Sequence, residues 1–420
     1  MIQGVEQARR DLLEIYRAGV DAVAGGPVVE AFLRRTPPVG EVSVIAVGKA
    51  AQAMAEGARR ALGGHLRDAL VITKQGYLDR YRLAEGMQGI ESAHPVPDLS
   101  SLEAGRHLLD YIDTRPEGRE LLFLISGGAS SLVEVPREGV GLEDLQRLNR
   151  WLLASGLPIS TINRLRTRLS RIKGGGLLAG LGGRAASALL ISDVQGDDPA
   201  LIGSGLLVPT PDDHALPGGL PEWVRHLCST QKEHPPGAAP LVDQHLVATL
   251  DQAREAAAQR ARELGYPTTL HRAFICADAE NSGRRLALEL LDLPPGVSIW
   301  GGEPTVRLPP EPGRGGRAQH LALAAAQVIE GSRDLCFLSA ATDGSDGPGE
   351  DAGGLVDGQS IARGAREGLE PDNALAHADA GRFLESSGDL ITTGPTGTNV
   401  MDLMIGLKWD LGGRDEHQGF

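Results

Sequence analysis

Six loops in the chain carry residue types that suit the binding of a phosphorylated ligand. Each follows a run of apolar residues, and their sequences are GKA, SGGASS, SDVQGDD, GGEPT, ATDGSDG and TTGPTGTN. Glycine leaves backbone N–H groups accessible to an anion, while Ser and Thr hydroxyls add hydrogen-bond donors. Ligands of open α/β sheets bind beyond the carboxyl ends of the strands, so the six loops predict one shared site.

The loops SGGASS and TTGPTGTN are the strongest candidates for anion binding. In the first, Gly127 and Gly128 can turn N–H groups towards an anion, and Ser130 and Ser131 supply hydroxyl donors. A helix after this loop would add its N-terminal dipole. A tight strand-to-helix turn is the alternative explanation. The residues predicted to bind phosphate or substrate are Ser126, Gly127, Gly128, Ser130, Ser131, Lys173, Thr396, Gly397, Thr398 and Asn399.

Two basic residues lie where they can neutralise a transferring phosphoryl group. Lys49 comes just after the apolar run VSVIAV, where a lysine can meet a phosphate or carboxylate as a point charge. Arg317 opens a predicted helix, a place where the helix dipole disfavours a cation, which indicates an anionic partner. Solvated surface side chains are the alternative for both residues.

The segment NRLRTRLSRIK predicts one basic helix that ends at three glycines. Arg164, Arg168 and Arg171 would share a face of it, because they are spaced by four and three residues. We expect Lys173 and an arginine of this helix to neutralise a phosphate. A solvated charged face is the alternative.

Carboxylates after two of the strands suit a magnesium ion. Asp193 and Asp198 lie in SDVQGDD, and Asp343 lies in ATDGSDG. Because Mg²⁺ takes one or two carboxylates together with phosphate oxygens and water, Asp193 and Asp343 are predicted metal ligands. Turn formation is the alternative, since Asp and Gly are turn residues. His94 in SAHPVPD, Glu303 in GGEPT and Asp198 are further candidates for the site.

Composition and missing motifs exclude several classes of protein. A formal net charge of −14 argues against nucleic acid as a partner, and no apolar run of about 18 residues predicts a membrane span. Three cysteines without metal-like spacing indicate reduced thiols in a cytoplasmic protein. The chain has no Walker A loop, no G-x-G-x-x-G after a strand, no G-x-S-x-G and no H-E-x-x-H.

Apolar runs bounded by glycine alternate with helical patterns, which in the first half of the chain predicts a parallel sheet covered on both faces, and over the whole chain predicts two α/β domains. The predicted strands are VSVIAV, DALVITK, ELLFLIS, AASALLIS, TTLHRAFIC, VSIWGG, DLCFLSAATDG and DLITTG. A Pro- and Gly-rich stretch at 216–240 predicts the connection, so the domains are expected at 1–230 and 240–420. The first helix is compatible with either domain.

With these loops the chain resembles the glycerate 2-kinases, a family also labelled hydroxypyruvate reductase, whose C-terminal part is called the MOFRL domain. The matching stretches are VGKAA, ESAHPVPD, LISGGASSL, INRLRTRLSRIKGG, LISDVQGDDP, GSG, GGEPTV, SAATDGSDG and TGPTGTNV. The resemblance implies an N-terminal Rossmann-like three-layer sandwich with a mostly parallel sheet, a C-terminal MOFRL-type α/β domain, and an active site in the interdomain cleft.

The resemblance also implies ATP- and Mg²⁺-dependent phosphorylation of D-glycerate at its 2-hydroxyl to give 2-phosphoglycerate. Lys49 and Arg317 match the basic pair that acts at the transferring group. The expected partners are D-glycerate and ATP, and the sequence leaves open whether the protein forms a homodimer. Two alternatives remain. One is an NAD(P)H-dependent hydroxypyruvate reductase, against which the missing G-x-G-x-x-G argues. The other is a non-catalytic homologue that binds a sugar acid or phosphate.

The chain departs from the usual family pattern at four positions. Ala318 and His320 replace Asn and Glu in G-G-R-N-Q-E, and Met401 replaces the second Asn of T-G-T-N-V-N-D. Gly176 stands where an arginine is common. Because polar contacts would be lost near the site, these departures bear on substrate identity more than on reaction class.

Overall fold

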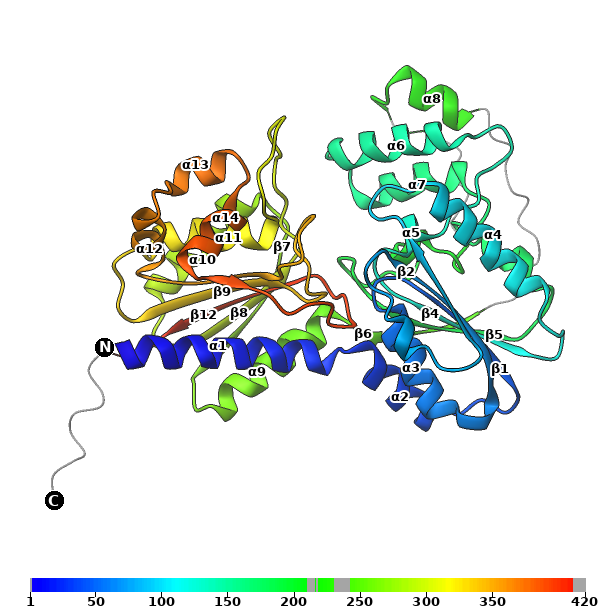
Figure 1. Ribbon diagram of the computed structural model, residues 1–420, viewed down its shortest axis with the longest axis horizontal. Helices are drawn as coiled ribbons and strands as arrows, with labels where there is room; N and C mark the ends of the chain where they lie inside the picture. The colour runs from blue at the N-terminus through cyan, green and yellow to red at the C-terminus, as the bar shows by residue number, and fades with distance from the viewer. Residues whose placement is uncertain (1, 210–215, 217, 230–241, 411–420) are drawn as a thin grey trace. The chain divides into compact units, whose positions relative to one another are not determined.

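The structure is a computed structural model that describes residues 2–209, 216, 218–229 and 242–410 (Figure 1). The chain divides into two compact units. The N-terminal unit comprises Ala24–Thr249 and Gly397–Asn399, and the C-terminal unit comprises Met1–Val23, Leu250–Thr396 and Val400–Phe420. Each unit is a sheet covered by helices, so the prediction of two α/β domains is confirmed.

The N-terminal unit is built on a six-stranded sheet whose neighbouring strands all pair in parallel. Its order is β3-β2-β1-β4-β5-β6, which reverses direction between β1 and β4. β1, VSVIAV, is buried at every position, because helices on both faces leave no polar side to the sheet. The strands are β1 (Val42–Val47), β2 (Leu66–Lys74), β3 (Met87–Ser92), β4 (Glu120–Ile125), β5 (Ala186–Ile191) and β6 (Asp243–Ala248).

Helices α2 and α3 cover one face of this sheet, and α4 and α5 lie on the other, with α6, α7 and α8 in a further layer beyond them (Figure 1). Phe123, Leu108 and Ile172 are among the buried side chains of the core. The helices are α2 (Gly25–Arg35), α3 (Ala51–Leu62), α4 (Leu99–Asp113), α5 (Ala129–Leu132), α6 (Leu142–Ala154), α7 (Ile159–Leu169) and α8 (Glu222–Ser229).

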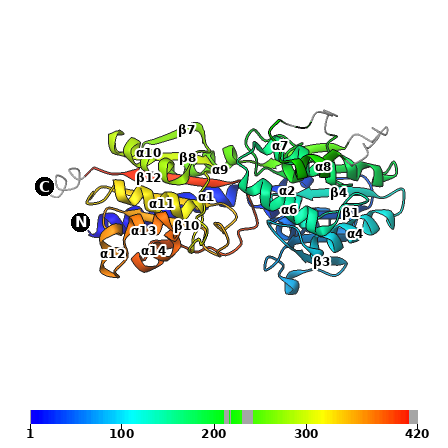
Figure 2. The same cartoon turned by 90° about the horizontal axis from the view of Figure 1, so that it is seen from above.

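The sheet of the C-terminal unit is mixed, with both parallel and antiparallel strand pairs. Its order is β11-β10-β9-β12-β8-β7, and only β7 and β8 pair in parallel. Two strands that were not predicted give the sheet its antiparallel pairs. Strand β12 enters between β8 and β9 and runs antiparallel to both (red in Figure 2), and β10 runs antiparallel to β9 and β11. The strands are β7 (Thr268–Ile275), β8 (Gly296–Gly302), β9 (Leu335–Ala341), β10 (Gly353–Asp357), β11 (Leu390–Ile391) and β12 (Asp402–Lys408).

Helices α1 and α9 cover one face of this second sheet, and the remaining helices of the unit cover the other (Figure 1). Helix α11 is rich in alanine and buried from Ala318 to Ala326, because small side chains let α10, α14 and the sheet pack closely around it. The helices are α1 (Ile2–Ala22), α9 (Leu250–Glu263), α10 (Ala279–Asp292), α11 (Arg317–Val328), α12 (Ser360–Arg366), α13 (Pro371–Ala376) and α14 (Ala380–Ser387).

The boundaries of the units differ from the expected 1–230 and 240–420. Residues 243–248 fall inside the expected C-terminal domain, but they form β6, which was not predicted and pairs with β5 in the first sheet. The first helix, which the sequence left open, groups with the C-terminal unit. Residues 230–241, around the expected break, lie outside the described residues. In the parts of the chain that are described, no helix has the length and apolar character needed to cross a membrane.

The single basic helix predicted for NRLRTRLSRIK is wrong. Helix α7 ends at Leu169, and Arg171 and Lys173 lie beyond it. Ser170 adopts an extended conformation and bridges to Pro136, so the backbone leaves the helix there. Arg171 therefore does not continue the helical face that carries Arg168.

Candidate functional site

The switch point of the first sheet carries the lysine and the glycine loop that the sequence singled out. Lys49 lies two residues past β1, and Gly127 lies two residues past β4. Because Val47 pairs with Ile125, both strands end at the same level. The Lys49 N–H donates to the Gly127 carbonyl at 2.9 Å. Ligands of open α/β sheets bind at such a reversal of strand order, which makes this the candidate site of the N-terminal unit.

Gly127 is crowded by two other predicted site residues. A Cβ placed on it would overlap the amide nitrogen of Asn399 and a carboxylate oxygen of Asp193. Asp193 follows β5, the neighbour of β4, and Asn399 comes from the segment 397–399 that belongs to the N-terminal unit. The structure therefore brings SGGASS, SDVQGDD and TGTN together around one glycine.

The next glycine of the loop approaches two more candidates. Gly128 has φ +88°, a left-handed conformation that favours glycine. A Cβ on it would lie 3.1 Å from the His94 ring and 3.4 Å from Cγ of Lys49. His94 and Lys49 thus lie beside the same stretch of backbone.

The hydroxyls of the SGGASS loop are engaged within the protein. Ser126 Oγ accepts from the Ala50 N–H at 3.0 Å, and Ser131 Oγ donates to the Gly128 carbonyl at 3.3 Å. Ser130 Oγ lies 2.6 Å from Ser204 Oγ. The expectation of a helix dipole here is wrong, because α5 is a single turn of four residues.

Lys173 lies in a buried ion pair, whereas the sequence placed it at a phosphate. Its ammonium pairs with the carboxylate of Glu134, and both side chains are at most 3% exposed. Burial lowers the pKa of Lys173, and the charge of Glu134 opposes that shift.

Two further candidates lie apart from the glycine loop. Burial raises the pKa of the Cys228 thiol, and the charge of nearby Arg168 opposes part of that rise. Asp198 is exposed and its carboxylate accepts from the Ala200 N–H at 2.9 Å, as expected of a turn.

Arg317 is the centre of a charged cluster in the C-terminal unit. Its Nε and Nη2 donate to the two carboxylate oxygens of Asp402 at 2.7 and 3.2 Å. Its Nη1 donates to Glu303 at 2.6 Å. The predicted anionic partner of this arginine is therefore supplied by protein carboxylates. Burial alone would lower the pKa of Arg317, but Asp402 and Glu303 raise it above its ordinary value.

A buried carboxylate compensates for the cation at the start of α11. Asp346 accepts the N–H groups of Ala318 at 3.1 Å and Gln319 at 2.8 Å. Asp346 lies in another loop, and its carboxylate therefore satisfies two backbone N–H donors in the first turn of α11. Burial and the charge of Asp402 raise the pKa of Asp346 to about 7.

The TTGPTGTN segment is divided between the two units. Thr396 Oγ1 donates to the Thr342 carbonyl at 2.6 Å, and the Thr396 N–H donates to the Asp343 carbonyl at 3.3 Å. One residue later, the Gly397 carbonyl accepts from the Gly25 N–H at 2.9 Å in the N-terminal unit. Thr398 and Asn399 are buried. Hydrogen bonds within each unit thus hold the two parts of this segment in place.

No group of three or more His, Cys, Asp or Glu side chains is arranged as a metal site in the part of the chain that is described. Mg²⁺ commonly takes only one or two carboxylates from the protein and its other ligands from phosphate and water. Asp193 fits that requirement, because its carboxylate lies against the glycine loop. Asp343 is buried, and its Oδ1 accepts from the Ser345 N–H at 2.9 Å.

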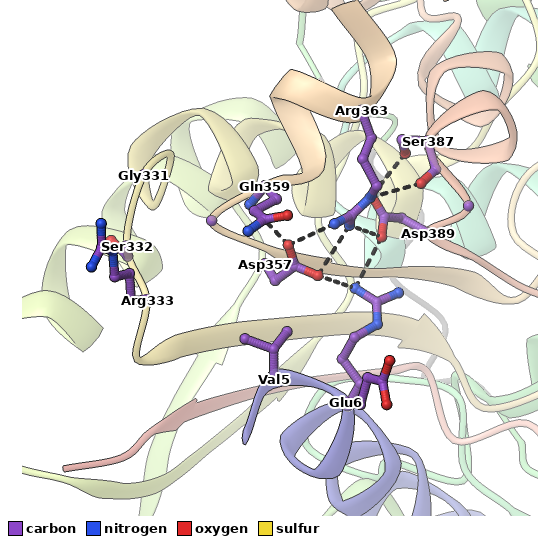
Figure 3. Close-up of a pocket in the computed structure, with 13 residues that line it drawn as sticks. Val5, Glu6, Gly331, Ser332, Arg333, Asp357, Gln359, Arg363, Ser387 and Asp389 are labelled. Atoms are coloured by element: carbon purple, nitrogen blue, oxygen red, sulfur yellow. Dashed lines mark hydrogen bonds and ion pairs between the residues drawn. The ribbon is translucent and has the colours of Figure 1, made fainter. Parts of the chain in front are cut away.

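A separate pocket of about 620 Å³ lies in the C-terminal unit, away from these residues (Figure 3). Arg9 and Arg363 pair there with the carboxylates of Asp357 and Asp389. The two positive and two negative charges balance one another, and the ion pairs connect α1 to β10. None of the predicted site residues lines this pocket.

Comparison with known proteins identifies the family. Residues 11–217 match a domain of unknown function, DUF4147, and residues 296–402 match the MOFRL family. A D-glycerate 2-kinase of Thermotoga maritima is 35% identical over 417 residues, which cover 96% of this chain and 99% of the relative. The chain belongs to the glycerate 2-kinase family with a C-terminal MOFRL domain.

A solved structure and a further relative are similar to this member of the glycerate 2-kinase family. A crystal structure of a glycerate kinase from Thermotoga maritima superposes with a TM-score of 0.81 at 35% identity, covering 96% of this chain and 100% of that one. A relative from Agrobacterium vitis that carries the name of a hydroxypyruvate reductase is 34% identical and covers 94% of this chain and 93% of its own. The predicted family and fold class are confirmed.

The four departures from the family pattern have distinct surroundings. Ala318 is fully buried, and His320 lies on α11 with Nε2 4.0 Å from Glu280 of α10. Met401 has φ 71°, a region where Asn is more often found than other side chains. A Cβ on Gly176 would overlap the carbonyl of Arg171, so this backbone has no room for a side chain.

Sequence reasoning missed three residues that build these clusters: Asp402, Glu134 and Ser204. Asp402 lies at the end of TGTNVMD, a stretch already singled out. Its position next to other candidates could have indicated it. Glu134 carries no local signal, because its partner is 39 residues away in the sequence.

Proposed function

We propose that the protein is a kinase that uses ATP and Mg²⁺ to phosphorylate D-glycerate at its 2-hydroxyl. The observation that carries this proposal is the convergence of Lys49, Asp193 and Asn399 on the glycine loop at the switch point of a parallel sheet. A cation, a hard oxygen ligand and accessible backbone donors are what a phosphorylated ligand needs. The names of two relatives, both glycerate 2-kinases, support this reaction.

Phosphoryl transfer asks the protein mainly for positioning and for neutralisation of charge. In this proposal, the backbone N–H groups of Gly127 and Gly128 bind an anionic group, and Lys49 and Arg317 stabilise charge on the transferring phosphoryl group. Asp193 would hold Mg²⁺, which when bound neutralises phosphate charge and orients the phosphate oxygens. Arg317 is prepared for its role, because Asp402 and Glu303 hold its guanidinium in place.

The test is an assay of ADP release with ATP, Mg²⁺ and D-glycerate, followed by phosphorus NMR of the product. Formation of 2-phosphoglycerate is the expected result. Formation of 3-phosphoglycerate would keep the kinase but refute the position of transfer. Consumption of NAD(P)H with hydroxypyruvate, without ADP release from glycerate, would favour the reductase instead.

A further inference from the structure

Ser130, Ser204 and Asn163 form a chain of hydrogen bonds, and the contacts of Asn163 determine which group donates in each bond. Asn163 Nδ2 donates to the Leu201 carbonyl at 3.1 Å, so the amide oxygen of Asn163 faces the other way. That oxygen accepts from Ser204 Oγ at 3.0 Å. Asn163 and Ser204 are 5% and 1% exposed, so this part of the chain is sheltered from water. The single proton of the Ser204 hydroxyl is therefore committed to Asn163.

This commitment determines what the next hydroxyl in the chain can do. Ser130 Oγ lies 2.6 Å from Ser204 Oγ, and one of the two must donate. Because Ser204 has already given its proton to Asn163, Ser130 is the donor in this contact. Ser130 itself is only partly buried. It consequently presents lone pairs, and no proton, to a ligand.

Backbone N–H groups, which are hydrogen-bond donors, lie next to the Ser130 acceptor. Within the described residues, no backbone carbonyl accepts a hydrogen bond from the N–H groups of Gly127 or Gly128. Lys49 lies beside Gly128. An anionic group is favoured at the N–H groups, while a phosphate oxygen at Ser130 Oγ would face another acceptor and be repelled. The arrangement suits a molecule with an anionic group and a hydroxyl close together.

We propose that Ser130 is a specificity-determining residue that accepts a hydrogen bond from the hydroxyl of glycerate that is not phosphorylated, the 3-hydroxyl. The carboxylate of the same molecule takes the N–H groups of the glycine loop. This assignment rests on the proposed function. It reverses the sequence-based expectation that Ser130 donates to a phosphate.

The first test compares D-glycerate with D-lactate, which keeps the carboxylate and the 2-hydroxyl but lacks the 3-hydroxyl. The wild-type protein should prefer glycerate by about tenfold or more in kcat/KM, as expected for one hydrogen bond in a site sheltered from water. Ser130→Ala should reduce kcat/KM for glycerate and leave the value for lactate nearly unchanged. Ser229→Ala, at the exposed end of α8, is the matched control and should change neither value.

Two outcomes would overturn the proposal. An equal loss for glycerate and lactate in Ser130→Ala would show that Ser130 does not recognise the 3-hydroxyl. Loss of discrimination between ATP and its 2′- or 3′-deoxy analogues in this variant would assign Ser130 to the ribose instead.

A binding measurement separates failure of this proposal from failure of the proposed function. Thermal shifts with glycerate and lactate, recorded without ATP, should show the same preference for glycerate and its loss in Ser130→Ala. If the wild-type protein releases no ADP but retains this preference, the kinase assignment fails and the role of Ser130 stands. If glycerate and lactate shift the melting temperature equally, the role of Ser130 is refuted.

Discussion

Arg317 and Asp402 form a two-bond fork in which Nε and Nη2 of the guanidinium donate to the two oxygens of one carboxylate, at 2.7 and 3.2 Å. Asp402 begins β12 and is fully buried, and Arg317 begins α11. A rigid strand therefore sets the plane and position of the guanidinium. Glu303, whose side chain is 42% exposed, accepts from the third nitrogen at 2.6 Å.

Replacing Arg317 tests its proposed role in catalysis. Arg317→Ala should lower kcat by about 10³-fold, since arginines at transferring phosphoryl groups contribute effects of this size. Arg317→Lys should retain only a small part of the wild-type kcat, because an ammonium group cannot form the two-bond fork with Asp402. Steady-state kinetics of ADP release measure both variants. A kcat within a few-fold of wild type in Arg317→Ala would refute the role.

The two carboxylate partners of Arg317 should differ in importance. Asp402→Asn removes a buried charge and one acceptor from the fork, and should destabilise the protein by about 3 kcal/mol or more. Glu303→Gln is the matched comparison and should cost less than about 1 kcal/mol, because its ion pair is partly exposed. Urea denaturation of the two variants measures the difference. Equal losses would show that burial does not decide the contribution of each partner.

Gly127→Ala tests whether catalysis depends on the close packing of Asn399 and Asp193 against Gly127. The added methyl group would overlap the side chains of Asn399 and Asp193, so one of them must move. A displacement of about 1 Å at a reacting centre can lower kcat/KM by about 10²-fold. Gly118→Ala is the control, since a Cβ there meets nothing within 4 Å. Unchanged kinetics in Gly127→Ala would mean that these groups do not act in the site.

The Lys173–Glu134 pair should matter for stability. Lys173→Met leaves the buried carboxylate of Glu134 without its partner and should cost about 3–5 kcal/mol in the free energy of unfolding. The double variant Lys173→Met/Glu134→Leu should recover most of that loss. Thermal and urea unfolding measure both. A variant Lys173→Met with wild-type stability and an increased KM for glycerate would instead support the ligand-binding role predicted from the sequence.

Asp346 predicts a dependence of stability on pH. Its pKa rises from 3.8 in the unfolded chain to about 7 in the folded one. Between these values the folded protein holds a proton that the unfolded chain has released, so this group's contribution to stability is lost as pH rises through that window. From about pH 5 to about pH 8, without divalent cations, the urea midpoint of the wild-type protein should fall relative to that of Asp346→Asn. Parallel pH profiles would contradict the raised pKa.

Local patterns were sufficient to predict much of the fold. Strand β1 and helix α11 have the continuous apolar run and the alanine-rich helical pattern of buried elements, and the structure contains both. Strand β12 was not predicted, and its partners β8 and β9 are distant in the sequence. Pairing direction in the second sheet depended on those distant partners.

By itself, the sequence determined the family, the α/β class and the loops that carry Lys49, Gly127 and Asp193, because short motifs and apolar periodicity are local properties of a chain. Only the tertiary structure decided which charges remain available and which are paired within the protein. Lys173 and Glu134 meet across 39 residues, and Ser130 becomes an acceptor through a chain that reaches Asn163. Burial and hydrogen-bond direction arise from contacts between distant segments, so the order of residues alone does not specify them.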